Sequence, residues 1–206
     1  MSGSLVLAST SARRRAMLSA AGFDAISISP FVDDGGLAVR ADHAAEDCCA
    51  LAWFKGAQIM NDLVRLKSHA PSARFILSAD TVCVLGSRVL GKPRDVDHAR
   101  HMLESARDQS QRVVTGVCII GIAEKSRNML ADSSEVRFGA ISDRQMDEHL
   151  EQGGWIGRAG GYNLEELVAA GWPVEWSGDQ STVTGLPMQL LTPILKRLLG
   201  GRVVGP

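Results

Sequence analysis

Several features that would place the chain in a common class are missing from its 206 residues. No apolar run approaches the roughly 20 residues that a helix needs to cross a bilayer. The N-terminus also has no basic segment followed by an apolar one, which is the pattern of a secretory signal. We therefore expect a cytoplasmic protein without a membrane segment.

Cysteine is scarce and shows no pairing pattern. The four cysteines are Cys48, Cys49, Cys83 and Cys118, and they include no C-x-x-C pair. This spacing argues against a zinc knuckle and against a disulfide framework. Because free cysteines usually pack as small apolar groups, we expect reduced, buried thiols.

Neither sign of charge dominates the sequence. It has 22 lysines and arginines against 23 aspartates and glutamates, a formal net charge of −1. A protein whose whole surface binds nucleic acid carries a basic excess, and no stripe of interleaved basic and aromatic residues is present. We therefore expect no nucleic-acid partner, although a local basic pocket is compatible with this composition.

Two nucleotide-binding fingerprints are also missing, since the chain has neither a Walker A loop nor a G-x-G-x-x-G motif. What is present is the composition of an ordinary globular protein, with 45% hydrophobic and 22% charged residues. No linker, internal repeat or low-complexity tract divides the chain. The length of 206 residues fits one large domain or two small ones.

Hydrophobic periodicity predicts an α/β protein. Helical patterns cover residues 12–21, 42–66, 96–107, 142–152 and 188–199, whereas strand-like runs cover residues 4–9, 24–29, 74–86, 111–123 and 128–141. The polar turn EKSR between the last two strand-like runs predicts a hairpin. Ser11, Asp95 and Ser142 stand at helix N-cap positions. This order of elements predicts a mixed sheet flanked by helices.

Three charged residues stand where core packing would not choose them. Asp80 lies in the middle of the most strand-like run, where a carboxylate is costly unless it meets a cation, a metal or hydrogen-bond donors. The alternative is a strand end at which Asp80 reaches water. Lys55 shares a helical stripe with apolar residues, unless its amine curls out to solvent. Lys92 precedes Pro93, which fixes its backbone, although a loop lysine can also be simply solvated.

The segment LVLASTSARRRAML, residues 5–18, places three arginines at the start of a predicted helix. That end of a helix is already positive, so the arginines either form a solvated face or meet a bound anion. The serines and backbone amides of ASTS could help to hold such an anion. A polyphosphate held with a divalent metal suits the cations Arg13, Arg14, Lys55 and Lys92 together with the acids Asp33, Asp34 and Asp80.

Together these segments resemble the Maf family of nucleotide pyrophosphatases. LVLASTSARRRAML resembles the family's opening L-A-S-x-S-P-R-R, VDD resembles V-D-E, and LAWFKGA resembles L-A-x-x-K-A. SADTVCVLGSRVLGKPRD is the closest stretch, and VVTGV, SSEVRF, AGGY and TVTGLPM follow in family order. The resemblance extends from about residue 5 to residue 199, so it implies a single domain over residues 1–206 with its core in that range. It implies an inosine-triphosphatase-like α/β fold, with a mixed sheet flanked by helices and two lobes around a cleft.

The resemblance also implies a reaction. Members hydrolyse a nucleoside triphosphate to the monophosphate and pyrophosphate with Mg²⁺ or Mn²⁺, usually as homodimers. By position, Asp80 is the proton acceptor, and Asp34 takes the place of a metal-associated glutamate, so that Asp34 and Asp80 would hold the metal. The residues that match the polar lining of the phosphate site are Ser9, Arg13, Arg14, Lys55 and Lys92. The residues at positions where members differ in preferred base are Arg13, Thr81 and Glu165.

The chain departs from the family pattern at several places. Ala12 replaces a proline, and GRAGGYNLEE replaces D-K-A-G-x-Y-G-I-Q-G, with Arg158 for Lys and Glu165 for Gln. Glutamine donates and accepts hydrogen bonds, whereas ionised glutamate only accepts them. The triplet ADT resembles members that act on dTTP and UTP rather than S-D-Q members that act on 7-methyl-GTP, but Glu165 leaves the base open. The alternative function is a catalytically weak nucleotide-binding regulator of cell division.

Overall fold

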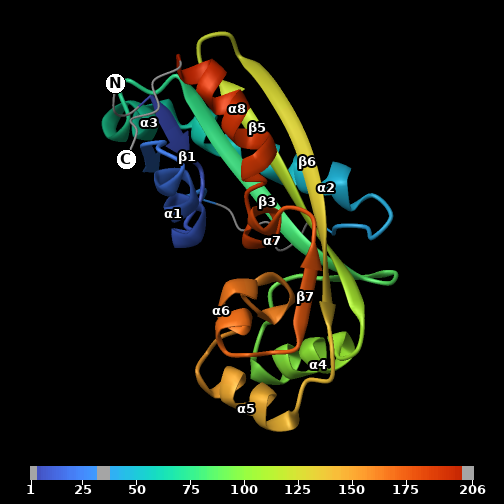
Figure 1. The fold of residues 1–206 in the computed structure, drawn as a ribbon. Helices are drawn as coiled ribbons and strands as arrows, with labels where there is room; N and C mark the ends of the chain where they lie inside the picture. Colours follow the sequence, from blue (N-terminus) through green and yellow to red (C-terminus); the bar gives the residue numbers. More distant parts are fainter. Residues whose placement is uncertain (1–3, 32–37, 201–206) are drawn as a thin grey trace.

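The computed structural model describes residues 4–31 and 38–200. Its centre is a seven-stranded sheet with the order β2-β1-β3-β5-β6-β7, and β4 pairs with β3 beside this path. β1 (Leu5–Leu7) runs parallel to β2 (Ala25–Ser27) and to β3 (Phe75–Leu85), whereas the other pairings are antiparallel. Helices lie on both faces of this sheet (Figure 1). The predicted α/β class, with a mixed sheet flanked by helices, is confirmed.

Three long strands connect the two lobes of the molecule. β3, β5 (Ser110–Gly121) and β6 (Ser126–Phe138) run from the upper lobe into the lower one (Figure 1). β5 and β6 form the predicted hairpin. Two short strands, β4 (Arg88–Leu90) and β7 (Val174–Ser177), lie in segments for which the sequence indicated no strand.

The upper lobe packs helices against both faces of the sheet. α1 (Ala12–Ala20) and α8 (Met188–Leu199) cover one face, where they bury alternate residues of β3. α2 (Ala44–Asn61) covers the other face, where it packs against the intervening residues of β3. α3 (Leu63–His69) follows α2 in the chain. Successive side chains of a strand point to opposite faces, so β3 is buried from both sides.

The single helix predicted over residues 42–66 is wrong, because the structure has two helices there. α2 ends at Asn61, and Asp62 separates it from α3. The Asp62 carboxylate accepts a hydrogen bond from the backbone N–H of Arg65 at 3.1 Å, so it caps the second helix. A side chain that satisfies an N-terminal amide favours a new helix start over continuation of the old helix.

The lower lobe is built from short helices around its own core. These are α4 (Val96–Ala106), α5 (Asp143–Glu151), α6 (Leu164–Ala169) and the 3-10 turn η1 (Ala159–Gly161). They pack with the lower ends of the long strands into one hydrophobic cluster (Figure 1). α7 (Gln180–Thr184) lies between the lobes and contacts β5, β6 and α1.

The predicted helix caps are confirmed. The side chains of Ser11, Asp95 and Ser142 each accept a hydrogen bond from a backbone N–H in the first turn of α1, α4 and α5. The four cysteines are free thiols, three of them buried, whereas Cys49 is half-buried. Over the described ranges, no helix combines the length and the apolar character of a membrane span.

Candidate active site

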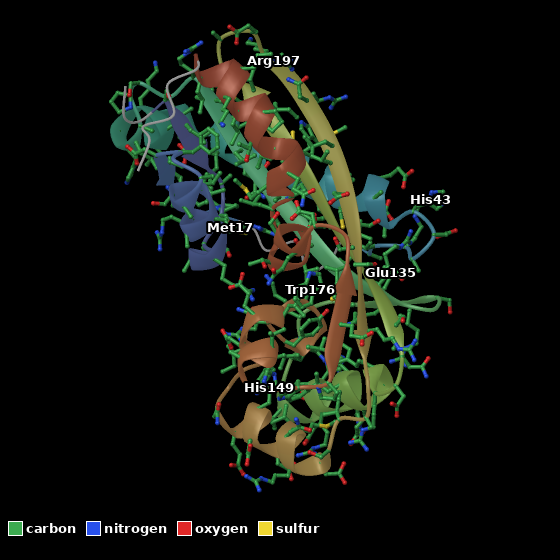
Figure 2. The ribbon with its side chains drawn as sticks, viewed as in Figure 1. Met17, His43, Glu135, His149, Trp176 and Arg197 are labelled. Carbon is green, nitrogen blue, oxygen red and sulfur yellow. The ribbon has the colours of Figure 1, made fainter. Side chains whose placement is uncertain are left out.

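An open cavity of about 700 Å³ lies between the two lobes. Its upper wall comes from the loop before α1, from α1 itself, from β3 and from α2, and its lower wall comes from η1 and α6. In Figure 2, Met17 marks α1 in the upper lobe and His149 marks the lower lobe. The cavity is therefore formed where segments far apart in the sequence meet.

Most of the residues predicted from the sequence line this cavity. They are Ser9, Arg13, Arg14, Lys55, Asp80, Thr81 and Lys92. Asp34, like Asp33, lies outside the described residues. Among the residues that are described, Glu165 does not line the cavity, whereas its neighbour Glu166 does.

Asp80 and Lys55 form an ion pair in the upper wall. Asp80 lies on β3 with a residue exposure of 8%, and the Lys55 ammonium group donates to its carboxylate. Asp80 is therefore not at an exposed strand end, and the Lys55 amine does not curl out to solvent. A carboxylate and an ammonium group so far from bulk water are tolerated because each compensates the charge of the other.

The close approach of α2 to the sheet brings this pair together. Gly116 on β5 is the register partner of Asp80. A Cβ at Gly116 would lie 2.4 Å from backbone atoms of Cys48 and Cys49, so the helix backbone touches the strand there. The Ser78 hydroxyl also donates to a backbone carbonyl of α2 at 2.6 Å. The helix is thus fixed at a separation that places Lys55 over Asp80.

Arg14 joins three elements of the upper wall. Its guanidinium donates to the carbonyl of Gly185 at 2.9 Å, to the carbonyl of Ala79 at 2.8 Å and to the hydroxyl of Thr81 at 3.0 Å. These bonds connect α1 with β3 and with the end of α7. Arg14 therefore brings a positive charge to the cavity in a fixed orientation.

The start of α1 faces the same cavity. Ser9 is 7% exposed, and its hydroxyl accepts a hydrogen bond from the backbone N–H of Ser11 at 3.1 Å. The positive end of a helix dipole and the orphan amides of the first turn attract anions. Arg13, on the first turn, adds its own charge, whereas Arg15 is exposed and does not line the described cavity.

Charged residues of the lower lobe influence the pKa of Arg13. Burial is the main cause that lowers the pKa of its guanidinium below the ordinary value for arginine, and repulsion by Arg158 lowers it further. Glu166 and Glu165 act in the opposite direction. Arg13 is therefore close enough to the lower wall to be influenced by its charges.

The lower wall contains a charge pair that the sequence did not predict. Arg158 donates to both carboxylate oxygens of Glu166, at 2.5 and 2.8 Å, and to the carbonyl of Gly154 at 2.6 Å. The Asn163 amide also donates to Glu166 at 3.2 Å. Sequence reasoning marked Arg158 as a departure from the family pattern, but no periodicity indicated Glu166.

The inner surface of the cavity includes two buried groups with perturbed acidity. Burial raises the pKa of the Cys83 thiol to about 12 and raises that of Tyr162 well above 10. The Tyr162 hydroxyl accepts a hydrogen bond from the buried Gln111 amide at 2.8 Å. Both groups stay protonated near neutral pH, so they form an uncharged part of the wall.

The residues present fit a divalent cation that arrives with a nucleotide. Within the described part of the chain, no three or more His, Cys, Asp or Glu side chains gather into a metal cluster. Mg²⁺ usually binds one or two carboxylates together with substrate phosphates and water, rather than a protein cage. Asp80 supplies such a carboxylate in the cavity wall.

Comparison with known proteins agrees with the motifs of the sequence. The family model described as Maf-like protein matches residues 4–198. A dTTP/UTP pyrophosphatase of Mesorhizobium japonicum is 34% identical over 184 residues, which cover 89% of this chain and 86% of that protein. Another of Chelativorans sp. is 33% identical and covers 93% and 89%, and one of Acholeplasma laidlawii is 28% identical and covers 93% and 95%. The chain therefore belongs to the Maf family.

Proposed function

We propose that the protein hydrolyses nucleoside triphosphates to the monophosphate and pyrophosphate, with a preference for dTTP and UTP. The names of its relatives, dTTP/UTP pyrophosphatases, support the reaction and the preference. The observation that carries the proposal is the Asp80–Lys55 pair in the wall of a cavity with further cations. A site that only binds a polyphosphate has no need of a carboxylate beside it, because that carboxylate repels the ligand.

The balance of charge favours a polyphosphate in the upper wall. Three cations line the cavity there, namely Arg13, Arg14 and Lys55, against one carboxylate of that wall among the described residues, Asp80. Lys92 adds a further cation from the segment that contacts η1. A pair of unit charges 4 Å apart is worth about 4 kcal/mol at an effective dielectric constant of 20. The attraction by the cations therefore outweighs the repulsion by one acid.

In the proposed reaction, the Asp80 carboxylate accepts a proton from a water molecule as the water oxygen bonds to the α-phosphorus. The bond from the α-phosphorus to the bridging oxygen breaks, and pyrophosphate leaves with the electron pair. Lys55 holds the carboxylate in place and compensates its charge. Lys92 and Arg13 neutralise the charge that grows on the phosphate oxygens.

We propose that the reaction uses Mg²⁺ or Mn²⁺, held by Asp80, by Asp34 and by phosphate oxygens. Such an ion, when bound, withdraws charge from phosphate oxygens and lowers the pKa of a coordinated water. Chelation by EDTA is expected to abolish turnover, and added Mg²⁺ or Mn²⁺ is expected to restore it. Undiminished turnover in EDTA would remove the metal from the proposal.

The direct test is to incubate the purified protein with dTTP, UTP, CTP and GTP in the presence of Mg²⁺ and to quantify the products. The proposal expects equal amounts of monophosphate and pyrophosphate, with dTTP and UTP consumed fastest. Release of orthophosphate would contradict the mechanism. Tight binding without turnover for every base and metal would favour the nucleotide-binding regulator instead.

Two further expectations concern the protein in the cell. Nucleoside triphosphates are consumed mainly in the cytoplasm, so we propose that the protein acts there. The family resemblance also implies a homodimer. Sedimentation velocity at several protein concentrations measures the oligomeric state, and a monomer at all of them would contradict this expectation.

A further inference from the structure

The charge pair of the lower wall has no part in the phosphate chemistry described above. Arg158 and Glu166 both line the cavity, and their side chains are 20% and 52% exposed. Each belongs to the lower lobe, whereas Asp80 and Lys55 belong to β3 and α2. The two pairs thus occupy opposite walls of one cavity.

The position of Glu166 indicates which end of a nucleotide lies against it. Its carboxylate repels phosphate oxygens, and the excess of positive charge lies on the upper wall. A triphosphate therefore lies toward Arg13 and Lys55, and the nucleoside extends toward the lower wall. Arg13 of α1 lines the same cavity as Arg158 and Glu166, so one ligand in that cavity can contact both walls.

The pair keeps hydrogen-bonding capacity for a ligand. A guanidinium has five N–H donors, and three of those of Arg158 are used by Gly154 and Glu166 in the contacts of the described residues. A carboxylate can accept about four hydrogen bonds, and Glu166 accepts from Arg158 and Asn163. A donor and an acceptor are therefore held side by side in the wall.

This arrangement matches the edge of one class of base. Uracil and thymine present an N3–H donor beside the O4 acceptor, so that Glu166 can accept from N3–H while Arg158 donates to O4. Cytosine presents the opposite order, with an N3 acceptor beside an N4 amino donor. Its N3 lone pair would face the carboxylate, so both groups would lose hydrogen bonds to water without gaining one to each other.

We propose that Arg158 and Glu166 are further specificity-determining residues of this enzyme, beside the positions that the family resemblance implies, and that they select the imide edge of uracil and thymine over cytosine. The proposal rests on the proposed pyrophosphatase function and adds the residues that read the base. Compared with the family motif D-K-A-G-x-Y-G-I-Q-G, this chain has Arg in place of Lys at 158 and Glu in place of Gly at 166. The two changes together create a bidentate pair, for which arginine has the required planar geometry.

The affinity for nucleoside monophosphates, measured by calorimetry, tests the proposal independently of catalytic turnover. The wild-type protein is expected to bind UMP about tenfold or more tightly than CMP, because the loss of a hydrogen bond to a charged group lowers affinity by about this factor. It is also expected to discriminate against 3-methyl-UMP, which lacks the N3–H donor, by a similar factor. Equal affinity for the three ligands would overturn the proposal.

Variants of Arg158 and Glu166 provide a second test of the proposal. In Glu166→Gln the amide can turn either its oxygen or its NH₂ toward the base, so we expect weaker UMP binding and nearly equal affinities for UMP and CMP. Glu148→Gln is the matched control, because Glu148 forms a surface pair with Arg144 at 2.8 Å on α5 and does not line the described cavity. Arg158→Lys keeps the charge but loses the planar guanidinium. If Glu166→Gln fails to fold, the affinities of Arg158→Lys for UMP and CMP test the proposal in its place.

Failure of this inference is distinguishable from failure of the proposed function. Hydrolysis of UTP to pyrophosphate with no UMP-over-CMP preference would overturn the role of the pair and leave the function standing. A clear UMP preference that Glu166→Gln removes, without hydrolysis of any triphosphate, would support the pair and overturn the function. No binding of either monophosphate would overturn the inference.

Discussion

Lys55 on α2 and Asp80 on β3 form an ion pair across the interface of helix and sheet, with side chains that are 14% and 12% exposed. Each residue is tolerated in this place because of the other. The pair also lines the cavity, so water and a ligand can reach it from one side. The same two side chains therefore combine a structural role with the chemical role that we propose for them.

The sharpest prediction concerns Asp80→Asn. Asparagine is nearly isosteric but cannot accept the proton of the attacking water, so turnover should fall by about 10²–10⁴-fold. The measurement is pyrophosphate release at saturating UTP, with circular dichroism to verify the fold. Lys55→Met, which keeps the apolar stem and deletes the charge, should also lower turnover. A change below about threefold for Asp80→Asn would show that the general base must be sought at another carboxylate.

Arg14→Lys should destabilise the protein although it conserves the charge. A lysine cannot donate simultaneously to Ala79, Gly185 and Thr81, which accept bonds from Arg14 on three elements. We expect a loss of about 2 kcal/mol in the free energy of unfolding, measured in urea. Arg15→Lys, at an exposed neighbouring position, is the control. Equal stability of the two variants would mean that the bonds of Arg14 contribute little.

Gly116→Ala should be costly because the added methyl group meets backbone atoms. The Cβ would lie 2.4 Å from atoms of Cys48 and Cys49, which cannot rotate away. We expect about 3 kcal/mol of destabilisation, as for severe overpacking, together with reduced turnover as Lys55 moves from Asp80. Gly91→Ala is the matched control for stability, since a Cβ at Gly91 would have no atom of the described residues within 4 Å apart from its chain neighbours. Thermal unfolding of both variants compares them directly.

His149 predicts a loss of stability in mild acid. Its imidazole contacts the carbonyl of Gly161 at 2.9 Å, and burial, the largest cause, lowers its pKa from the ordinary 6.5. The unfolded chain therefore binds a proton more readily than the folded one. The stability that His149 contributes is present above pH 6.5 and declines as the pH falls toward the folded-state pKa.

Urea unfolding at about pH 7.5 and about pH 5.5 measures this effect. The wild-type protein should lose more stability between the two values than His149→Gln, which has no titrating ring. His43→Gln, at an exposed site before α2 (Figure 2), is the control and should follow the wild type. The same loss in His149→Gln as in the wild type would assign the pH dependence to other groups.

Much of the fold and the upper wall could be predicted because their signals are local. The alternation of β3 and the apolar stripe of α2 are periodic patterns, and Asp80 and Lys55 are conspicuous as charges within them. The break at Asp62 was missed because the apolar pattern continues across it. β4 and β7 are too short to show a period.

The lower wall could not be predicted because its geometry depends on tertiary turns. Gly160 and Gly161 have φ values of 69° and 79°, and they lie in the turn between Arg158 and α6. Only this turn brings Arg158 to Glu166, and no spacing rule of a helix or strand encodes it. The same turn decides that Glu166, and not the predicted Glu165, lines the described cavity.

The contact at Gly116 has a consequence for how this protein can change. The separation between the ammonium group and the carboxylate is limited by main chain against main chain, which substitutions elsewhere in the core do not alter. Apolar side chains around α2 can therefore be exchanged for others of similar volume while the geometry of the Lys55–Asp80 pair is kept. The position with the least freedom to vary is then one that has no side chain.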